Sequence, residues 1–369
     1  MGSYNSTLPS SRLIVQSTKT FPISGGHNRS FFLDTNGSVW FCGKKPGQLK
    51  ITKSHKLENL PEIKEISSGE NHILFLDFEG KVWVWGDNCK GQLGICDIKY
   101  CKEPIIIQNI PPILSISCGF AHSLLLDFEG FVWTFGNNFD GQLGLDNVHF
   151  QLVPAKIPDL PKIQRISCSG DRSFFLDVRG AVWFCGENLS FIRQDNIAKL
   201  KTHKPFKIER LPPIQYFTCG KRHALFLDIF GNIWACGANK FGELGLGDFR
   251  NRTSPEQLYG IPQIQFIASG SSHSFLLDIH GRVWGFGRNN FGQLGRDSRE
   301  YPHLNKPTKI SHIRCVQFVS CGNYHSLFLD NMGTVWSCGD NDCLQLGRST
   351  LPADHRPARI FGIPQIKAC

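Results

Sequence analysis

A unit of about fifty residues recurs along this chain, and this repetition constrains the fold more than any other feature. The unit is clearest at Ser117–Gly144 (SCGFAHSLLLDFEGFVWTFGNNFDGQLG), where a Gly-x-x-His motif precedes an apolar run ending in Asp127. A Glu-Gly turn, an aromatic run around Trp133 and a Gly-Gln-Leu-Gly loop follow. A period of this length indicates stacked units that bury one another's surfaces. The Asp recurs as Asp34, Asp77, Asp127, Asp177, Asp228, Asp278 and Asp330, and the Trp as Trp40, Trp83, Trp133, Trp183, Trp234, Trp284 and Trp336.

Each unit has the pattern of a small antiparallel sheet. The apolar runs Ser123–Asp127 and Phe131–Phe135 flank the turn Phe128-Glu129-Gly130, which predicts a β-hairpin with the glycine in the left-handed region. Asp127 stands at the turn, where its carboxylate can accept backbone N–H bonds. Ile113–Ser117 predicts a strand before the hairpin, and Val153–Ile157 predicts one after it.

A four-stranded sheet that is apolar on both faces cannot bury both faces alone, but copies packed around an axis can. The predicted fold is therefore all-β, a seven-bladed β-propeller with four-stranded antiparallel blades. We expect the ring to close by pairing of N- and C-terminal segments, with Arg12–Ser24 and Pro357–Ile366 meeting in or beside one blade. Residues 1–20 are predicted to be a polar leader and residues 21–369 a single domain. The repeat cores lie near 24–43, 66–86, 116–136, 166–186, 217–237, 267–287 and 319–339.

The histidine of the Gly-x-x-His motif is present in five copies, and arginine replaces it in the other two, as Arg29 and Arg172. The same two copies lose the Gly-Gln-Leu-Gly loop: the first reads Gly-Gln-Leu-Lys, and the fourth has no such sequence in 187–198. Because the replacement leaves the surrounding pattern intact, we interpret these histidines, like the Asp and Trp residues of the repeat, as structural, and we expect the Trp residues in the blade cores. The five histidines are His72, His122, His223, His273 and His325.

Cysteine usage favours a reducing compartment, cytosol or nucleus. The chain has 14 cysteines, most of them at repeat positions where other copies carry Ser, Trp or Phe, and no Cys-x-x-Cys pair occurs. This pattern predicts reduced thiols, with neither a metal site nor a disulfide framework, and no cofactor is predicted. The sequence has no run of about 18 apolar residues and no signal-peptide pattern. The start Met-Gly-Ser-Tyr-Asn-Ser makes Gly2 a candidate for myristoylation, and membrane contact is expected only with that modification.

Two basic stretches lie in the copies that lack the histidine. Five lysines and no acid lie between Lys44 and Lys56, and eight Lys or Arg lie against two acids between Arg193 and Arg222, in a chain of formal net charge +9. We interpret them as candidate rim surfaces for an acidic partner, with solvated charge as the alternative. Nucleic acid is not favoured, because only Phe191 and Phe206 interleave with the basic residues of the second stretch. The candidate residues are Lys44, Lys45, Lys50, Lys53, Lys56, Arg193, Lys199, Lys201, Lys204, Lys207 and Arg210.

These motifs resemble the repeat of the regulator of chromosome condensation family. The resemblance rests on Cys/Ser-Gly-x-x-His-Ser, Gly-x-Val-Trp-x-x-Gly and Asn-x-x-Gly-Gln-Leu-Gly, and it extends from about Ser24 to about Ile366. It implies a seven-bladed propeller and three classes of role. These are a protein-interaction platform, guanine-nucleotide exchange on a Ran-like small GTPase, and substrate adaptor of a ubiquitin ligase.

We favour the platform, as a monomer that binds protein partners without enzymatic activity. No Gly-x-Ser-x-Gly motif or Walker loop is present, and the regular spacing of the Asp residues keeps them from pairing as acid and base. The family's exchange factor is known for a wedge inserted in one blade and a basic N-terminal tail. Here the later repeat intervals of 50, 50, 51, 50 and 52 residues leave no room for a wedge, and the first twenty residues carry only Arg12 and Lys19.

Overall fold

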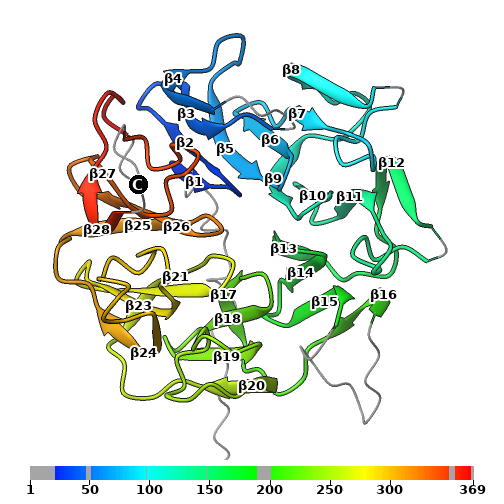
Figure 1. Cartoon of the computed structure of the whole chain (residues 1–369). Helices are drawn as coiled ribbons and strands as arrows, with labels where there is room; N and C mark the ends of the chain where they lie inside the picture. Colours follow the sequence, from blue (N-terminus) through cyan, green and yellow to red (C-terminus); the bar gives the residue numbers. More distant parts are fainter. Residues whose placement is uncertain are drawn as a thin grey trace, which may run out of the picture.

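Seven antiparallel sheets, each of four strands, form a closed ring in the computed structural model of the chain (Figure 1). The structure describes residues 21–46, 51–96, 98–146, 148–188, 201–348 and 354–366, and within these ranges it has no helix. The predicted fold class, a seven-bladed β-propeller, is confirmed. We number the blades 1 to 7 in chain order.

The strands of each blade are contiguous in the sequence. Blade 1 comprises β1 (Ile23–Gly25), β2 (Arg29–Leu33), β3 (Val39–Lys44) and β4 (Ile51–Lys56); blade 2 comprises β5 (Ile63–Ser68), β6 (His72–Asp77), β7 (Val82–Asp87) and β8 (Tyr100–Ile106). Blade 3 comprises β9 (Ile113–Cys118), β10 (His122–Asp127), β11 (Val132–Asn137) and β12 (Phe150–Lys156); blade 4 comprises β13 (Ile163–Cys168), β14 (Arg172–Asp177), β15 (Val182–Glu187) and β16 (Lys201–Lys207). Blade 5 comprises β17 (Ile214–Cys219), β18 (His223–Asp228), β19 (Ile233–Gly237) and β20 (Arg252–Gln257); blade 6 comprises β21 (Ile264–Ser269), β22 (His273–Asp278), β23 (Val283–Arg288) and β24 (His303–Lys309). Blade 7 comprises β25 (Val316–Cys321), β26 (His325–Asp330), β27 (Val335–Gly339) and β28 (Asp354–Arg359).

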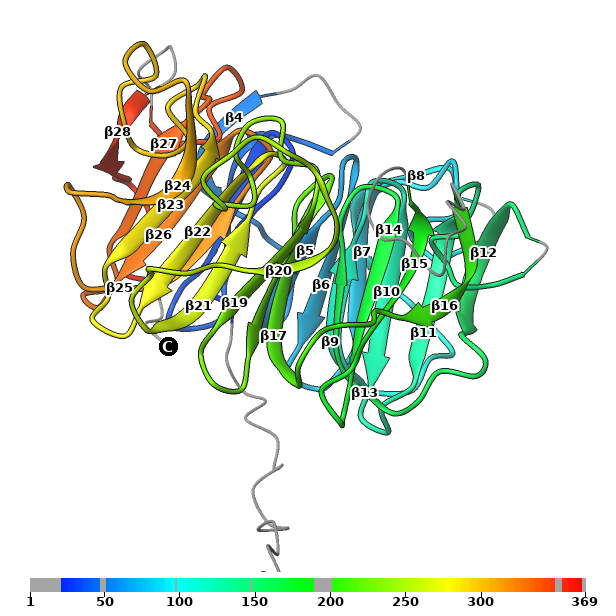
Figure 2. The same cartoon turned by 90° about the horizontal axis from the view of Figure 1, so that it is seen from below.

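The first strand of each blade faces the central axis and the fourth forms the outer rim (Figures 1 and 2). The ring closes where β1 lies beside β25 of blade 7. The two terminal segments meet there: Ile23 pairs with Phe32 inside blade 1, and Ile366 forms a bridge with Asp34 of the same blade. The predicted meeting of the termini beside one blade is therefore found in the described residues, while every blade keeps its own four strands.

The repeated Asp and Trp are two halves of one hairpin lock. In blade 3, Asp127 Oδ1 accepts the backbone N–H groups of Glu129 (3.0 Å) and Phe131 (2.9 Å) across the turn. Its Oδ2 accepts the indole N–H of Trp133 at 2.9 Å, and Gly130 has the predicted positive φ of 82°. The same Asp–Trp bond recurs in all seven blades.

The tryptophans of the lock are half-buried, whereas we expected them in the blade cores. The bond to Asp draws each indole towards the turn, and its polar edge then needs that carboxylate as a partner. Leucine and phenylalanine of the second strands fill the cores instead, as in β10, where all six residues are buried. Each apolar cluster joins neighbouring blades, as between blades 2 and 3, so no blade buries its faces alone.

The hairpin lock makes Asp127 a stability determinant. We expect Asp127→Ala to lower the free energy of unfolding by about 2–4 kcal/mol, because two turn N–H groups and the indole N–H lose an ionised acceptor. Urea unfolding followed by tryptophan fluorescence measures the change. Glu129→Ala is the matched control, since only its backbone takes part in the turn. A loss below about 0.5 kcal/mol, the range of ordinary surface substitutions, would contradict the lock.

Candidate functional site

The motif histidine of one blade bonds a serine of the next blade. His72 Nε2 lies 3.0 Å from Ser123 Oγ, and the ring is fully buried. The same pair recurs at four other junctions, including the closing junction from blade 7 to blade 1. These pairs are His122–Ser173 (3.0 Å), His223–Ser274 (2.8 Å), His273–Ser326 (3.1 Å) and His325–Ser30 (2.9 Å).

The Gly-Gln-Leu-Gly loop completes this contact. Ser123 Oγ also bonds the carbonyl oxygen of Gln92, in the loop of the blade that supplies His72, at 2.8 Å. The serine has one hydroxyl hydrogen, which the carbonyl must accept, so the serine oxygen accepts a hydrogen from His72 Nε2. We call the chain from histidine N–H through serine hydroxyl to loop carbonyl the blade clasp. The loop carbonyls of the other four clasps belong to Gln142, Glu243, Gln293 and Gln345.

The two irregular repeats lack every part of the clasp together. Blades 1 and 4 carry arginine for histidine and lack the Gly-Gln-Leu-Gly loop, and the next blades carry Ile73 and Ala224 where the serine would be. Sequence reasoning found the joint loss of histidine and loop but not its cause, nor the missing serine. The signal was present: the residue after the motif histidine or arginine fails to be Ser only in blades 2 and 5.

The two arginines bridge their junctions differently. Arg29 Nε donates to the Lys44 carbonyl (3.0 Å) in its own blade, and a terminal nitrogen donates to the Glu70 carbonyl (2.9 Å) in blade 2. Arg172 likewise bonds the Glu187 carbonyl in its own blade and the Lys221 carbonyl in blade 5. It also forms an ion pair of 2.7 Å with the Glu187 carboxylate. Burial lowers the pKa of Arg29 to about 10, which leaves it charged at neutral pH.

Burial keeps the clasp histidines neutral. It lowers the pKa of all five to about 3. The clasp uses the Nε2–H tautomer, and Nδ1 of His72 is buried without a hydrogen-bond partner. A proton on Nδ1 would have no acceptor there, so protonating the ring would bury an unpaired N–H group. This cost adds to the cost of burying the charge.

The glycine of the Gly-x-x-His motif makes room for the ring. A Cβ on Gly69 would lie 2.3 Å from His72 Cε1 and 2.6 Å from the Gly119 carbonyl oxygen, so no larger residue fits beside the clasp. In blade 4, where arginine replaces histidine, this position is Ser169.

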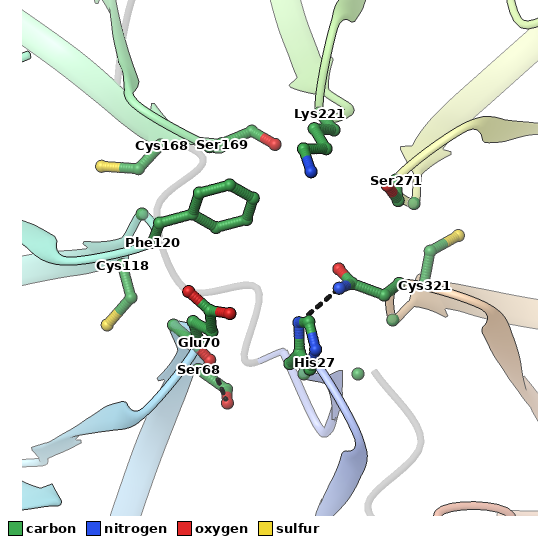
Figure 3. A pocket seen from close by; sticks show the side chains of 18 of the residues that line it. His27, Ser68, Glu70, Cys118, Phe120, Cys168, Ser169, Lys221, Ser271 and Cys321 are labelled. Carbon is green, nitrogen blue, oxygen red and sulfur yellow. Dashed lines mark hydrogen bonds between the residues drawn. The ribbon is translucent and has the colours of Figure 1, made fainter. Parts of the chain in front are cut away.

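The residue after this glycine lines a cavity of about 140 Å³ at the end of the central axis, which we call the hub mouth (Figure 3). Each blade contributes one such residue, and all seven differ, although the glycine before it recurs in six blades and a histidine or arginine follows two residues later in all seven. Figure 3 shows side chains from several blades converging on the opening. The seven residues are His27, Glu70, Phe120, Gly170, Lys221, Ser271 and Asn323.

The hub mouth combines both signs of charge with an aromatic ring. The Lys221 ammonium lies 5.0 Å from the centroid of Phe120, and His27 hydrogen-bonds Asn323 across the seam between blades 1 and 7. Burial lowers the pKa of His27, so its imidazole is neutral near pH 7. Backbone bonds run around the mouth from blade to blade, as from Phe120 N–H to the Gly170 carbonyl (2.9 Å), and fix its outline. Sequence reasoning missed this site because its residues share a position rather than a residue type.

Five of the predicted basic rim residues lie on outermost strands on opposite parts of the ring (Figure 1). Lys53 and Lys56 lie on β4 of blade 1, and Lys201, Lys204 and Lys207 lie on β16 of blade 4. Lys44 ends β3, and Lys45 and Arg210 lie outside the strands. The structure brings two of the rim residues to acids of blade 3: Lys201 pairs with Asp140 and Lys204 with Asp146, each at 2.9 Å. Part of the excess charge counted in the sequence is therefore neutralised. Lys53, Lys56, Lys207 and Arg210 are exposed, and Lys44 and Lys45 are half-buried. Lys50, Arg193, Lys199 and Gly2 lie outside the described residues.

The described residues contain neither a candidate metal site nor a membrane-spanning helix. No group of three or more His, Cys, Asp or Glu is placed to hold a metal ion. No helix in the same ranges has the length and apolar character to cross a membrane.

A clasped seven-bladed ring with a divergent hub defines the class of this protein as a repeat-built β-propeller scaffold. The pattern of the RCC1-like domain matches residues 101–369, and that of the regulator of chromosome condensation (RCC1) repeat matches residues 63–92. The chain belongs to the RCC1-like family, as the resemblance of its motifs implied.

Relatives of known structure share the fold. Prp20p from Saccharomyces cerevisiae is 24% identical with a TM-score of 0.78, over 89% of this chain and 87% of that one. Human WBSCR16 is 23% identical with a TM-score of 0.76, over 88% of this chain and 90% of that one. The probable E3 ubiquitin-protein ligase HERC6 of Homo sapiens is 30% identical over 164 residues, which are 42% of this chain and 16% of HERC6.

The clasp predicts a cost for removing one serine. We expect Ser173→Ala to lower the free energy of unfolding by about 2–3 kcal/mol, because His122 loses its acceptor and two buried hydrogen bonds disappear. Urea unfolding measures the loss. The matched control is Ala224→Ser, which adds a hydroxyl at the equivalent position of an arginine junction. A gain from this control as large as the loss from Ser173→Ala would contradict the clasp.

The buried histidines also predict acid sensitivity. Between about pH 6.5 and 3 these histidines are protonated in the unfolded chain and neutral in the folded protein. The free energy of unfolding therefore falls as pH falls through this window, by up to about 1.4 kcal/mol per pH unit for each histidine. Glu65 and Glu243 act in the opposite direction, because burial raises their pKa to about 7. Unfolding free energies of the wild type and His122→Gln at pH 7.5, 6.0 and 5.0 isolate one histidine. We expect a shallower slope for the variant, and equal slopes would contradict the assignment.

Proposed function

We propose that this protein is a non-enzymatic protein-interaction platform of the RCC1-like type, and that its partner places a loop or a chain end in the hub mouth. The observation that carries the proposal is the divergence of one repeat position. Seven different residues occupy it, inside a motif whose first residue is glycine in six blades and whose last is histidine or arginine in all seven, and together they line one cavity. Positions that repeat build the scaffold, whereas a rigid scaffold presents recognition residues where its loops diverge.

The two charged residues of the hub mouth are held by the irregular junctions. Glu70 and Lys221 follow the junctions where arginine replaces the clasp, and each offers its carbonyl oxygen to that arginine. Their backbones are thus fixed while their side chains face the opening (Figure 3). With Phe120 between them, the mouth suits a segment that carries an acidic group, a basic group and an apolar side chain.

The relatives support a protein as the partner. Prp20p binds Gsp1p and histones, which are proteins. Exchange activity on a Ran-like GTPase and a role as ubiquitin-ligase adaptor remain the alternative roles. The free cysteines of the described residues support action in a reducing compartment, cytosol or nucleus.

The hub mouth gives a direct test. Tagged wild type, Lys221→Glu and Phe120→Ala are used for affinity purification with quantitative mass spectrometry. We expect at least one partner to be depleted about tenfold by both variants, equivalent to about 1.4 kcal/mol of binding free energy. The matched control is Lys207→Glu on the outer rim, which we expect to retain that partner. Retention by the hub variants with loss by the rim variant would refute the hub and favour the basic rim.

The exchange alternative has its own readout. Small GTPases loaded with a fluorescent nucleotide are mixed with the wild-type protein, and nucleotide release is followed. We expect no acceleration across the panel. Acceleration that Lys221→Glu abolishes would replace the platform by an exchange factor.

A further inference from the structure

The outer strand of blade 3, β12, exposes apolar side chains in a way that the other outer strands do not. Phe150, Leu152 and Val153 are 36%, 52% and 43% exposed. Among the other outer strands, as far as the structure describes them, only Ile51 of β4 is a large exposed apolar residue. Exposed apolar edge strands invite pairing with another chain, and proteins usually protect them with charge.

The outer edge of β12 pairs with no other strand in the described part of the chain. β12 is the last strand of its sheet, its strand partner there is β11, and its Val153 carbonyl accepts a bond from Gln151 Nε2 at 2.9 Å. The register shifts between Thr134 and Gly136, so Leu152 and Val153 have no partner residue on β11. Pro154 has no N–H and limits the segment available for pairing to Phe150–Val153. Figure 1 shows β12 at the rim, away from the hub mouth.

An aromatic cluster continues the apolar surface at one end of β12. The ring of Phe139, which is 45% exposed, lies 4.8 Å from Phe150 and 5.3 Å from His149, measured between centroids. The Lys90 ammonium, from the loop of blade 2, lies 4.9 Å from the Phe150 centroid. This loop is packed tightly against β12, since a Cβ on Gly91 would lie 2.8 Å from the Gln151 carbonyl oxygen. The backbone that carries Lys90 is therefore held beside the strand.

The charge around β12 is positive at both ends. Lys90 lies at the start of the strand, and Lys156 ends it, with its ammonium over the Phe131 ring. The acids of the neighbouring loop, Asp140 and Asp146, are already paired with lysines of β16. A partner that covers this edge would therefore meet an apolar middle between cations.

We propose that β12 binds an extended segment of a partner protein as an added strand. The segment pairs along Phe150–Val153, places apolar side chains on Leu152 and Val153, and carries acidic residues at its ends, near Lys90 and Lys156. Main-chain pairing supplies affinity, and the alternate side chains with the flanking charges supply specificity. This surface is separate from the hub mouth, so the two sites can fail or succeed independently.

A displayed peptide library tests the proposal. Bacteria that display random 12-residue peptides are sorted with the fluorescent full-length protein, and the enriched clones are sequenced. We expect clones with alternating apolar residues flanked by Asp or Glu. Their binding should fall at least tenfold with Leu152→Asp/Val153→Asp and with Lys90→Glu. Lys221→Glu, in the hub mouth, should leave it unchanged.

Lys306→Asp is the matched control, because Lys306 occupies in blade 6 the place of Val153 in blade 3. We expect it to bind the clones like the wild type, and thermal melting checks that all variants are folded. Enrichment of no clone that depends on Leu152 and Val153 would overturn the proposal. So would a wild-type dimer in sedimentation that Leu152→Asp/Val153→Asp converts to a monomer, because the edge would then be occupied by a second copy of this chain.

Discussion

The blade clasp is the interaction on which the ring depends. Its histidine and loop carbonyl come from one blade and its serine from the next. His72 and Gln92, which are 20 residues apart in the sequence, both bond Ser123 of the following blade. A repeat cannot lose one part without leaving a buried polar group unpaired, which costs more than a hydrogen bond contributes. This explains why the parts are lost together. It also explains how the ring closes without a shared blade, since His325 and Ser30 form the same clasp across the seam.

The two arginine junctions divide the ring into unequal arcs. Clasps join blades 2 to 4 into one arc and blades 5, 6, 7 and 1 into the other. Each arginine also fixes the backbone of the next hub residue. The departures from the repeat thus occur where the hub becomes charged, as is typical of functional positions in an otherwise consistent sequence.

Much of the fold could be predicted because its determinants are local. The hairpin, the left-handed glycine and the turn carboxylate lie within a dozen residues, and their sevenfold recurrence indicates the ring. The indole bond to Asp127, and with it the half-buried place of Trp133 near the turn, could have been inferred from the constant spacing of six residues. The blade clasp could not be predicted from one repeat, because its serine lies in the next blade and its position depends on how the two blades pack. The ion pairs of Lys201 and Lys204 needed the outer strand of blade 4 beside the loop of blade 3, which no local pattern indicates.

Scaffold and recognition occupy different positions of the same repeat. At the inner end of a blade, Gly69 and His72 are fixed by the clasp, while Glu70 between them is free to differ in every blade. At the outer end, the fourth strand contacts only one strand of its own sheet, so its composition is constrained by solubility rather than by packing. In the described residues, the other six outer strands together expose one large apolar side chain, Ile51, whereas β12 exposes three. Selection for solubility alone would remove such an edge, whereas a partner that covers it would preserve it.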